Sequence, residues 1–117
     1  MVYKIGTVSE IATIPIAEDK AKEWIYHFTQ ILEGEYGAER DINSVGGYVI
    51  YAPKGATAKE IKDIFDYTEC LIELSDIVGD VCYAMYLLGD DYGVVIVASI
   101  DAMPVGILKE IIKQKEI

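Results

Sequence analysis

Two apolar runs in the second half of the chain constrain the fold more than any other feature. Residues 81–88 and 94–100 are apolar at both even and odd positions, and a short segment with Gly89 and Gly93 at its ends separates them. Such runs, bounded by turn residues, are typical of a β-hairpin. Because successive side chains of a strand point to opposite faces, a strand that is apolar at every position must be covered on both faces. The chain is therefore predicted to fold around a central antiparallel hairpin.

Three further segments have the apolar spacing of amphipathic helices, at residues 16–33, 57–67 and 104–115. The first is predicted from apolar residues three and four positions apart, which are Ala21, Trp24, Ile25, Phe28, Ile31 and Leu32. A capping-box spacing (S/T-x-x-E) begins at Thr57 and predicts that the second helix starts there. Pro104 fits the first turn of the third helix, where its missing N–H leaves no hydrogen bond unmade.

The remaining apolar segments are predicted to be strands. Residues 1–15 alternate loosely and indicate a strand or an extended arm that ends at Pro15. Residues 48–52 and 69–74 flank the second helix, and a strand–helix–strand unit of this kind is typical of a parallel β-α-β crossover. Together these elements predict a single compact domain of residues 1–117 in the α+β class, with a mixed sheet of four to five strands.

The predicted core, and the helices that cover it, bear on whether the chain forms a dimer. Six apolar residues should be largely buried: Phe28, Ile64, Phe65, Val95, Val97 and Leu108. The three helices are expected to cover one face of the sheet, which would leave the other face of the hairpin bare. A bare apolar sheet face would aggregate, so we predict a homodimer in which a second copy covers it. The alternative is a helix on each face of one chain.

Charge is distributed unevenly along the chain. The 46 residues from 63 to 108 hold nine carboxylates and no Lys, Arg or His, so this block carries a charge of −9 in a chain of net charge −10. A protein that binds a nucleic-acid backbone needs a stripe of basic side chains, and the sign is wrong for anionic membranes too. We therefore expect no direct binding to nucleic acid or membrane, and a basic protein as partner.

The function predicted from this charge is that of a small acidic, non-enzymatic protein-interaction module. A sharper form is an inhibitor that occupies the nucleic-acid channel of its partner by imitating phosphate charge. The contact is predicted to involve the hairpin tip and the residues near it: Asp90, Asp91 and Tyr92, with Asp76 and Asp80. Tyrosine is enriched at interfaces, although most of the nine tyrosines in the chain are interpreted as half-buried strand residues.

The alternative function is that of a dimeric sensor or binding domain, which holds a small molecule at the subunit boundary. The turn formed by Lys54, Gly55 and Thr57 joins a strand to a helix N-terminus, where backbone N–H groups can bind an anion. A deep apolar pocket with one or two polar groups would favour this alternative. A concentrated cluster of carboxylates on one surface would favour the interaction module.

No motif in the chain predicts catalysis. His27 has no serine or cysteine partner in a recognisable motif, and Asp90 and Asp91 are ordinary turn residues, so we predict no catalytic residue, metal or cofactor. Cys70 and Cys82 are interpreted as small apolar residues in a reducing compartment. The N-terminus does not have the pattern of a secretory signal and no apolar run is long enough to span a membrane, so we expect a cytoplasmic protein.

Overall fold

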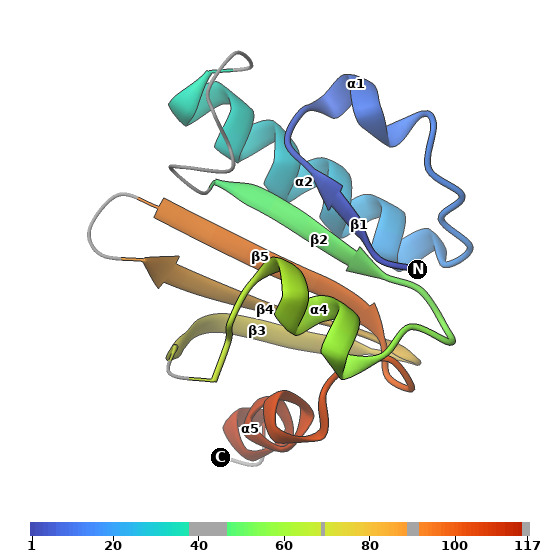
Figure 1. Ribbon diagram of the computed structural model, residues 1–117, viewed down its shortest axis with the longest axis vertical. Coiled ribbons are helices and arrows are strands. Elements are labelled where there is room, and N and C mark those ends of the chain that lie inside the picture. Colours follow the sequence, from blue (N-terminus) through green and yellow to red (C-terminus); the bar gives the residue numbers. More distant parts are fainter. Residues whose placement is uncertain (38–46, 69, 89–91, 116–117) are drawn as a thin grey trace.

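Five strands in the described part of the chain form one mixed sheet, with helices on both of its faces (Figure 1). The computed structural model describes residues 1–37, 47–68, 70–88 and 92–115. The strands are β1 (Tyr3–Ile5), β2 (Tyr48–Ala52), β3 (Ile72–Val78), β4 (Val81–Leu88) and β5 (Tyr92–Ser99). The helices are α1 (Val8–Ile11), α2 (Asp19–Tyr36), α4 (Ala58–Ile64) and α5 (Val105–Lys115). The α+β class and the mixed sheet are therefore confirmed.

The central hairpin is confirmed as β4 and β5, which pair antiparallel along their whole length, from Val81 opposite Ser99 to Leu88 opposite Tyr92. A second hairpin was not predicted. It joins β3 to β4 through Gly79 and Asp80, and the backbone φ of 63° at Gly79 lies in the left-handed region that glycine adopts without strain.

The strand order is β1-β2-β5-β4-β3, and this order corrects the predicted crossover. β2 pairs in parallel with β5 and not with β3, whereas the other neighbours are antiparallel. β3 does run in the same direction as β2, but it forms the edge of the sheet beyond β4. The burial of the two strands explains this placement, because β5 is buried from Gly93 to Ser99 while β3 carries exposed or half-buried polar residues. A central position suits the apolar strand and an edge suits the polar one.

Helices cover both faces of the sheet, which corrects the prediction of three helices on one face. On one face, α1 and α2 pack against a cluster that includes Val95 and Val97 of β5. On the other face, α4 and α5 pack against a cluster that includes Val94, Ile96 and Ala98 of the same strand. The described helices thus cover β5 on both sides, so the wholly bare face from which the homodimer was predicted is not observed, and the homodimer itself stays a prediction.

The ends of the elements follow local signals in most places. Thr57 caps α4 as predicted, because its Oγ1 accepts a hydrogen bond from the backbone N–H of Glu60 at 3.2 Å. The helix ends before residue 65, earlier than predicted. The predicted arm over residues 1–15 is wrong beyond β1, since α1 starts after Thr7, whose N–H donates to the carboxylate of Glu10 at 3.0 Å. This Thr-x-x-Glu spacing is a second capping signal that the loose alternation concealed.

The predicted core is largely confirmed. Phe28, Phe65, Val95 and Val97 are buried. Ile64 and Leu108 are only partly buried, packed against the cluster on the α4–α5 face.

Candidate functional site

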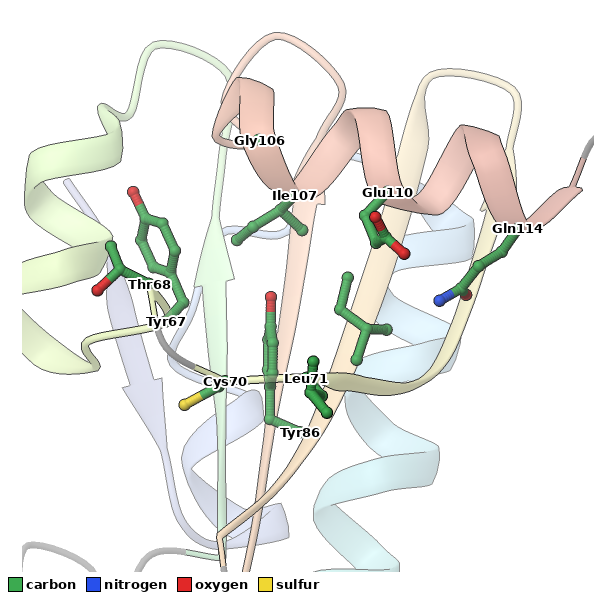
Figure 2. Close-up of a pocket in the computed structure, with 10 residues that line it drawn as sticks. Tyr67, Thr68, Cys70, Leu71, Tyr86, Gly106, Ile107, Glu110 and Gln114 are labelled. Atoms are coloured by element: carbon green, nitrogen blue, oxygen red, sulfur yellow. The ribbon is translucent and has the colours of Figure 1, made fainter.

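A cavity of about 580 Å³ opens on the α4–α5 face of the sheet, between α5 and the segment that leads from α4 into β3 (Figure 2). Three parts of the chain line it: residues 67–68 and 70–72, from the connecting segment to the start of β3, Tyr86 of β4, and one side of α5 from Gly106 to Gln114. These parts are distant in sequence, and the sheet and the two packed layers bring them together.

The ring of Tyr86 forms the floor of the cavity. Only 1% of this residue is exposed, and its ring packs against Phe65 with 5.3 Å between centroids. Figure 2 shows its hydroxyl directed toward α5 near Ile107. Burial raises the pKa of Tyr86, with smaller contributions from Cys70 and Tyr67. The phenol therefore stays protonated at neutral pH and can donate or accept a hydrogen bond.

The wall on α5 combines apolar and polar groups. Ile107, Glu110 and Gln114 are three and four positions apart, which places them on the same side of the helix. Ile107 is buried, whereas Glu110 and Gln114 are exposed at the rim. The Oε1 of Gln114 accepts a hydrogen bond from Ser75 Oγ at 2.7 Å, which leaves the amide NH₂ group as the donor on the cavity side, as Figure 2 shows.

The opposite wall is a compact turn held by Asp66. The carboxylate of Asp66 accepts hydrogen bonds from the N–H of Thr68 at 3.1 Å and from its hydroxyl at 2.6 Å. These bonds lower the pKa of Asp66. The N–H of Cys70 then donates to the carbonyl of Tyr67 at 3.2 Å. The turn thereby holds the Tyr67 ring and the Cys70 thiol at the cavity, and it leaves Leu71 84% exposed beside its mouth.

A smaller depression of about 350 Å³ lies on the other face, between α2 and the outer strands. Trp24 and Tyr83 meet there edge to face, with 4.8 Å between ring centroids. Beyond them the outer strands are not covered by a helix, and Leu74, Val78 and Leu87 are exposed. This apolar surface on β3 and β4 is called the outer-strand face below.

The structure brings together only part of the predicted partner-binding residues. Asp76 lies on β3 and Asp80 in the turn that follows it. Asp90 and Asp91 lie outside the described residues, and Tyr92 is described only as the first residue of β5, opposite Leu88. Along β4, about 23 Å separates Val81, the residue after Asp80, from Leu88, the residue opposite Tyr92, at about 3.3 Å per residue. Tyr92 is therefore not adjacent to Asp80, and the contact at the hairpin tip stays a prediction.

Asp76 is engaged within the chain. Its Oδ1 lies 2.6 Å from Nζ of Lys115, at the end of α5. Lys115 also donates to the carbonyl of Ile77 at 3.0 Å, and the N–H of Ile77 donates to Asp76 Oδ1 at 2.8 Å. The hydrogen bond from Lys115 is the largest cause of a lowered pKa at Asp76. Asp76 thus ties α5 to the edge of the sheet.

Part of the predicted anion-binding turn is engaged within the chain. Lys54 and Gly55 are exposed, and Gly55 has a φ of 94°. The Thr57 hydroxyl is used for the cap, and Glu60 lies in the first turn of α4 with its carboxylate 2.8 Å from the N-terminal amino group. A carboxylate in the first turn suits the positive end of the helix, and binding of an external anion at this turn stays a prediction.

Sequence reasoning missed the residues that line the large cavity. Tyr67 and Tyr86 were counted among ordinary strand tyrosines, and Glu110 was not considered. One signal was present in the sequence. Gly106 stands in the first turn of α5, where most other residues favour a helix more, and a Cβ built there meets no atom within 4 Å. The signal is weak, because Gly106 lines the mouth of the cavity whereas Gly34 has the same open space and lies outside it.

Metal and membrane sites find no support in the described residues. Among them, no three His, Cys, Asp or Glu side chains are grouped so that they could hold a metal ion. No helix in the described ranges combines the length and the apolar character that crossing a membrane requires. Cys82 is buried and Cys70 is half-buried, and no disulfide links them.

Comparisons with protein-family models, with curated proteins and with solved structures find no match to this chain.

Proposed function

We propose that this protein is a small-molecule-binding domain whose ligand occupies the cavity between α5 and residues 67–68 and 70–72. The observation that carries the proposal is the cavity itself. Its volume of about 580 Å³ falls within the range of roughly 300–1,000 Å³ that is typical of ligand pockets. Its lining is also of the expected kind, since apolar and aromatic groups surround a few polar ones.

The cavity lies within one chain, which distinguishes this proposal from a site at a subunit boundary. The floor is held in place because Tyr86 is buried and belongs to β4, which pairs with a strand on each side, and the Asp66 turn and the bond between Ser75 and Gln114 support the walls. A preformed site of this kind loses little conformational entropy when a ligand enters. The proposal assigns binding to the cavity and no catalytic step.

The test fills the cavity without disturbing the core. Gly106→Phe places a ring at the mouth, where a Cβ meets nothing within 4 Å. Gly34→Phe is the matched control, because Gly34 is also an exposed helical glycine with nothing within 4 Å, but it lies on α2 outside the cavity. Binding of the neutral probe 2-phenylethanol is followed by the amide NMR signals of residues 67–72 and 106–114.

We expect the probe to shift these signals in the wild type and in Gly34→Phe, and to leave them unchanged in Gly106→Phe. Shifts that persist in Gly106→Phe, or that map to other parts of the chain, would contradict the assignment of the cavity as the binding site.

A protein-interaction role is the second candidate, and the outer-strand face favours it. Leu74, Val78 and Leu87 are exposed there, next to Asp76 and Asp80. Aliphatic side chains beside carboxylates suit a partner with apolar and basic groups. Within the described ranges, only Asp63 and Asp76 of the basic-free block form an ion pair, so much of its charge remains available to steer such a partner.

The variant Leu74→Glu with Asp80→Lys tests this second candidate. The immobilised wild type should retain a basic partner at low salt. The double variant should not retain it, and high salt should release it from the wild type. If the double variant still retains the partner, and high salt does not release it, the outer-strand face is not the binding surface. If the partner is a nucleic-acid-binding protein, competition with its nucleic acid would identify the inhibitory form.

A further inference from the structure

The cavity has an unusual distribution of charge. Among the described residues that line it, none is Lys, Arg or His, and Glu110 is the one carboxylate. The connecting segment and β4 belong to the block of residues 63–108, which has no basic side chain. Lys115 at the end of α5 is held by Asp76 and by the carbonyl of Ile77. A negatively charged ligand would therefore meet a carboxylate and no lining cation.

The aromatic side chains that line the cavity also favour a positively charged ligand. Tyr67 and Tyr86 line the cavity from the connecting segment and from β4, and Figure 2 shows the Tyr86 ring below α5 and the Tyr67 ring to the side of its first turn. The faces of aromatic rings carry partial negative charge and attract cations. Their hydroxyl groups can accept hydrogen bonds from an ammonium group. The carboxylate and the rings together favour a cation over a neutral or an anionic molecule of the same shape.

The remaining lining is apolar and suits the body of such a ligand. Ile107 is buried, Ile72 is partly buried, and Leu71 is exposed at the mouth. These groups offer burial to a hydrocarbon or an aromatic ring. The charged group, in contrast, lies at the rim, where Glu110 is exposed. A ligand that matches both parts has an apolar body and one cationic end.

We infer that the cavity binds an apolar ammonium compound, with its body against Tyr86, Ile107 and Ile72 and its ammonium group at the carboxylate of Glu110. This inference rests on the proposed function of the cavity and adds the chemical class of its ligand. Because the positive end stays at the rim, the compound keeps part of its hydration and does not have to bury an unpaired charge.

Three probes that share a phenyl body separate charge from shape: 2-phenylethylammonium, 2-phenylethanol and phenylacetate. Their dissociation constants are measured by NMR titration at pH 7 and low ionic strength. We expect the ammonium probe to bind about tenfold more tightly than the alcohol, which is the ratio that one charge-assisted hydrogen bond at a partly exposed site can supply. Phenylacetate should bind more weakly than either.

Two variants with the same change in net charge then locate the preference. Glu110→Gln should weaken the ammonium probe to the level of the alcohol and leave the alcohol itself unchanged. Asp80→Asn removes one exposed carboxylate beyond the other end of β3, away from the cavity, and it should keep the tenfold ratio. An equal loss in both variants would assign the preference to the overall charge of the protein and overturn the role of Glu110.

The outcomes separate this inference from the proposed function. If the three probes bind equally, or if Glu110→Gln retains the preference, the inference about the ligand class fails while binding to the cavity stands. If none of the probes shifts the signals of residues 67–72 and 106–114, the proposed function fails, and the inference fails with it.

Discussion

Two adjacent isoleucines on α5 test whether this helix covers the second face of the sheet. Ile111 is 0% exposed in the cluster below α5, whereas Ile112 is 41% exposed on the same helix. Ile→Ala removes three carbon atoms, worth about 2.4 kcal/mol at about 0.8 kcal/mol per buried group. The space left in the core adds to this cost, and the better helix propensity of alanine offsets a few tenths of a kcal/mol. We expect Ile111→Ala to lower the free energy of unfolding by about 3 kcal/mol.

Ile112→Ala is the matched control, because the chemical change and the helix are the same. It loses only part of the transfer free energy and leaves no internal space, so we expect a loss of at most about 1 kcal/mol. Urea denaturation measures both, and with a slope of about 2 kcal/mol per molar the two midpoints should differ by about 1 M. Equal midpoints, or a larger loss for Ile112→Ala, would refute the placement of α5.

Substitutions at two other side chains should change the free energy of unfolding in opposite directions. Asp76→Asn should lower the unfolding free energy at pH 7 by less than about 1 kcal/mol, since the ion pair with Lys115 is partly exposed. Because folding lowers the pKa of Asp76, its contribution is present above the unfolded pKa of about 3.9 and is lost as the pH falls through the folded pKa. The difference between variant and wild type should therefore shrink in urea titrations below about pH 4, and a difference that grows there would refute this linkage. The hydroxyl of Thr29 is buried with no hydrogen-bond partner among the described residues. Thr29→Val should therefore raise the unfolding free energy by about 1 kcal/mol. A lower midpoint in thermal unfolding would show that the hydroxyl has a partner.

Local sequence patterns predicted the elements that depend on local interactions. The apolar stripe of α2 and the cap at Thr57 gave two helices, and Pro104 marked the start of the third. The hairpin of β4 and β5 followed from two apolar runs around a turn. In each case the residues that decide the structure are neighbours in sequence, and their spacing carries the period of the helix or strand.

Local patterns could not predict which strands pair or which face of the sheet each helix covers. An amphipathic stripe shows that α4 and α5 each bury one side, but it does not say which face of the sheet receives it. The parallel pairing of β2 with β5 joins segments more than 40 residues apart, and the competition between β3 and β5 for that place depends on burial in the complete fold. For the same reason no spacing rule indicated the cavity, since Tyr67, Tyr86 and Glu110 meet only after the two layers have packed.

The contacts of Lys115 and Asp76 have a consequence for the exposed edge of the sheet. β3 is an edge strand, and its turn to β4 has two residues, so Ile77 directs its N–H and C=O away from β4. Both groups are already bonded, the N–H to Asp76 and the C=O to Lys115. An incoming strand from another molecule would have to displace these side chains before it could extend the ladder. At Ile77 the edge of β3 is thereby protected against strand addition, and α5 supplies one of the two side chains that protect it.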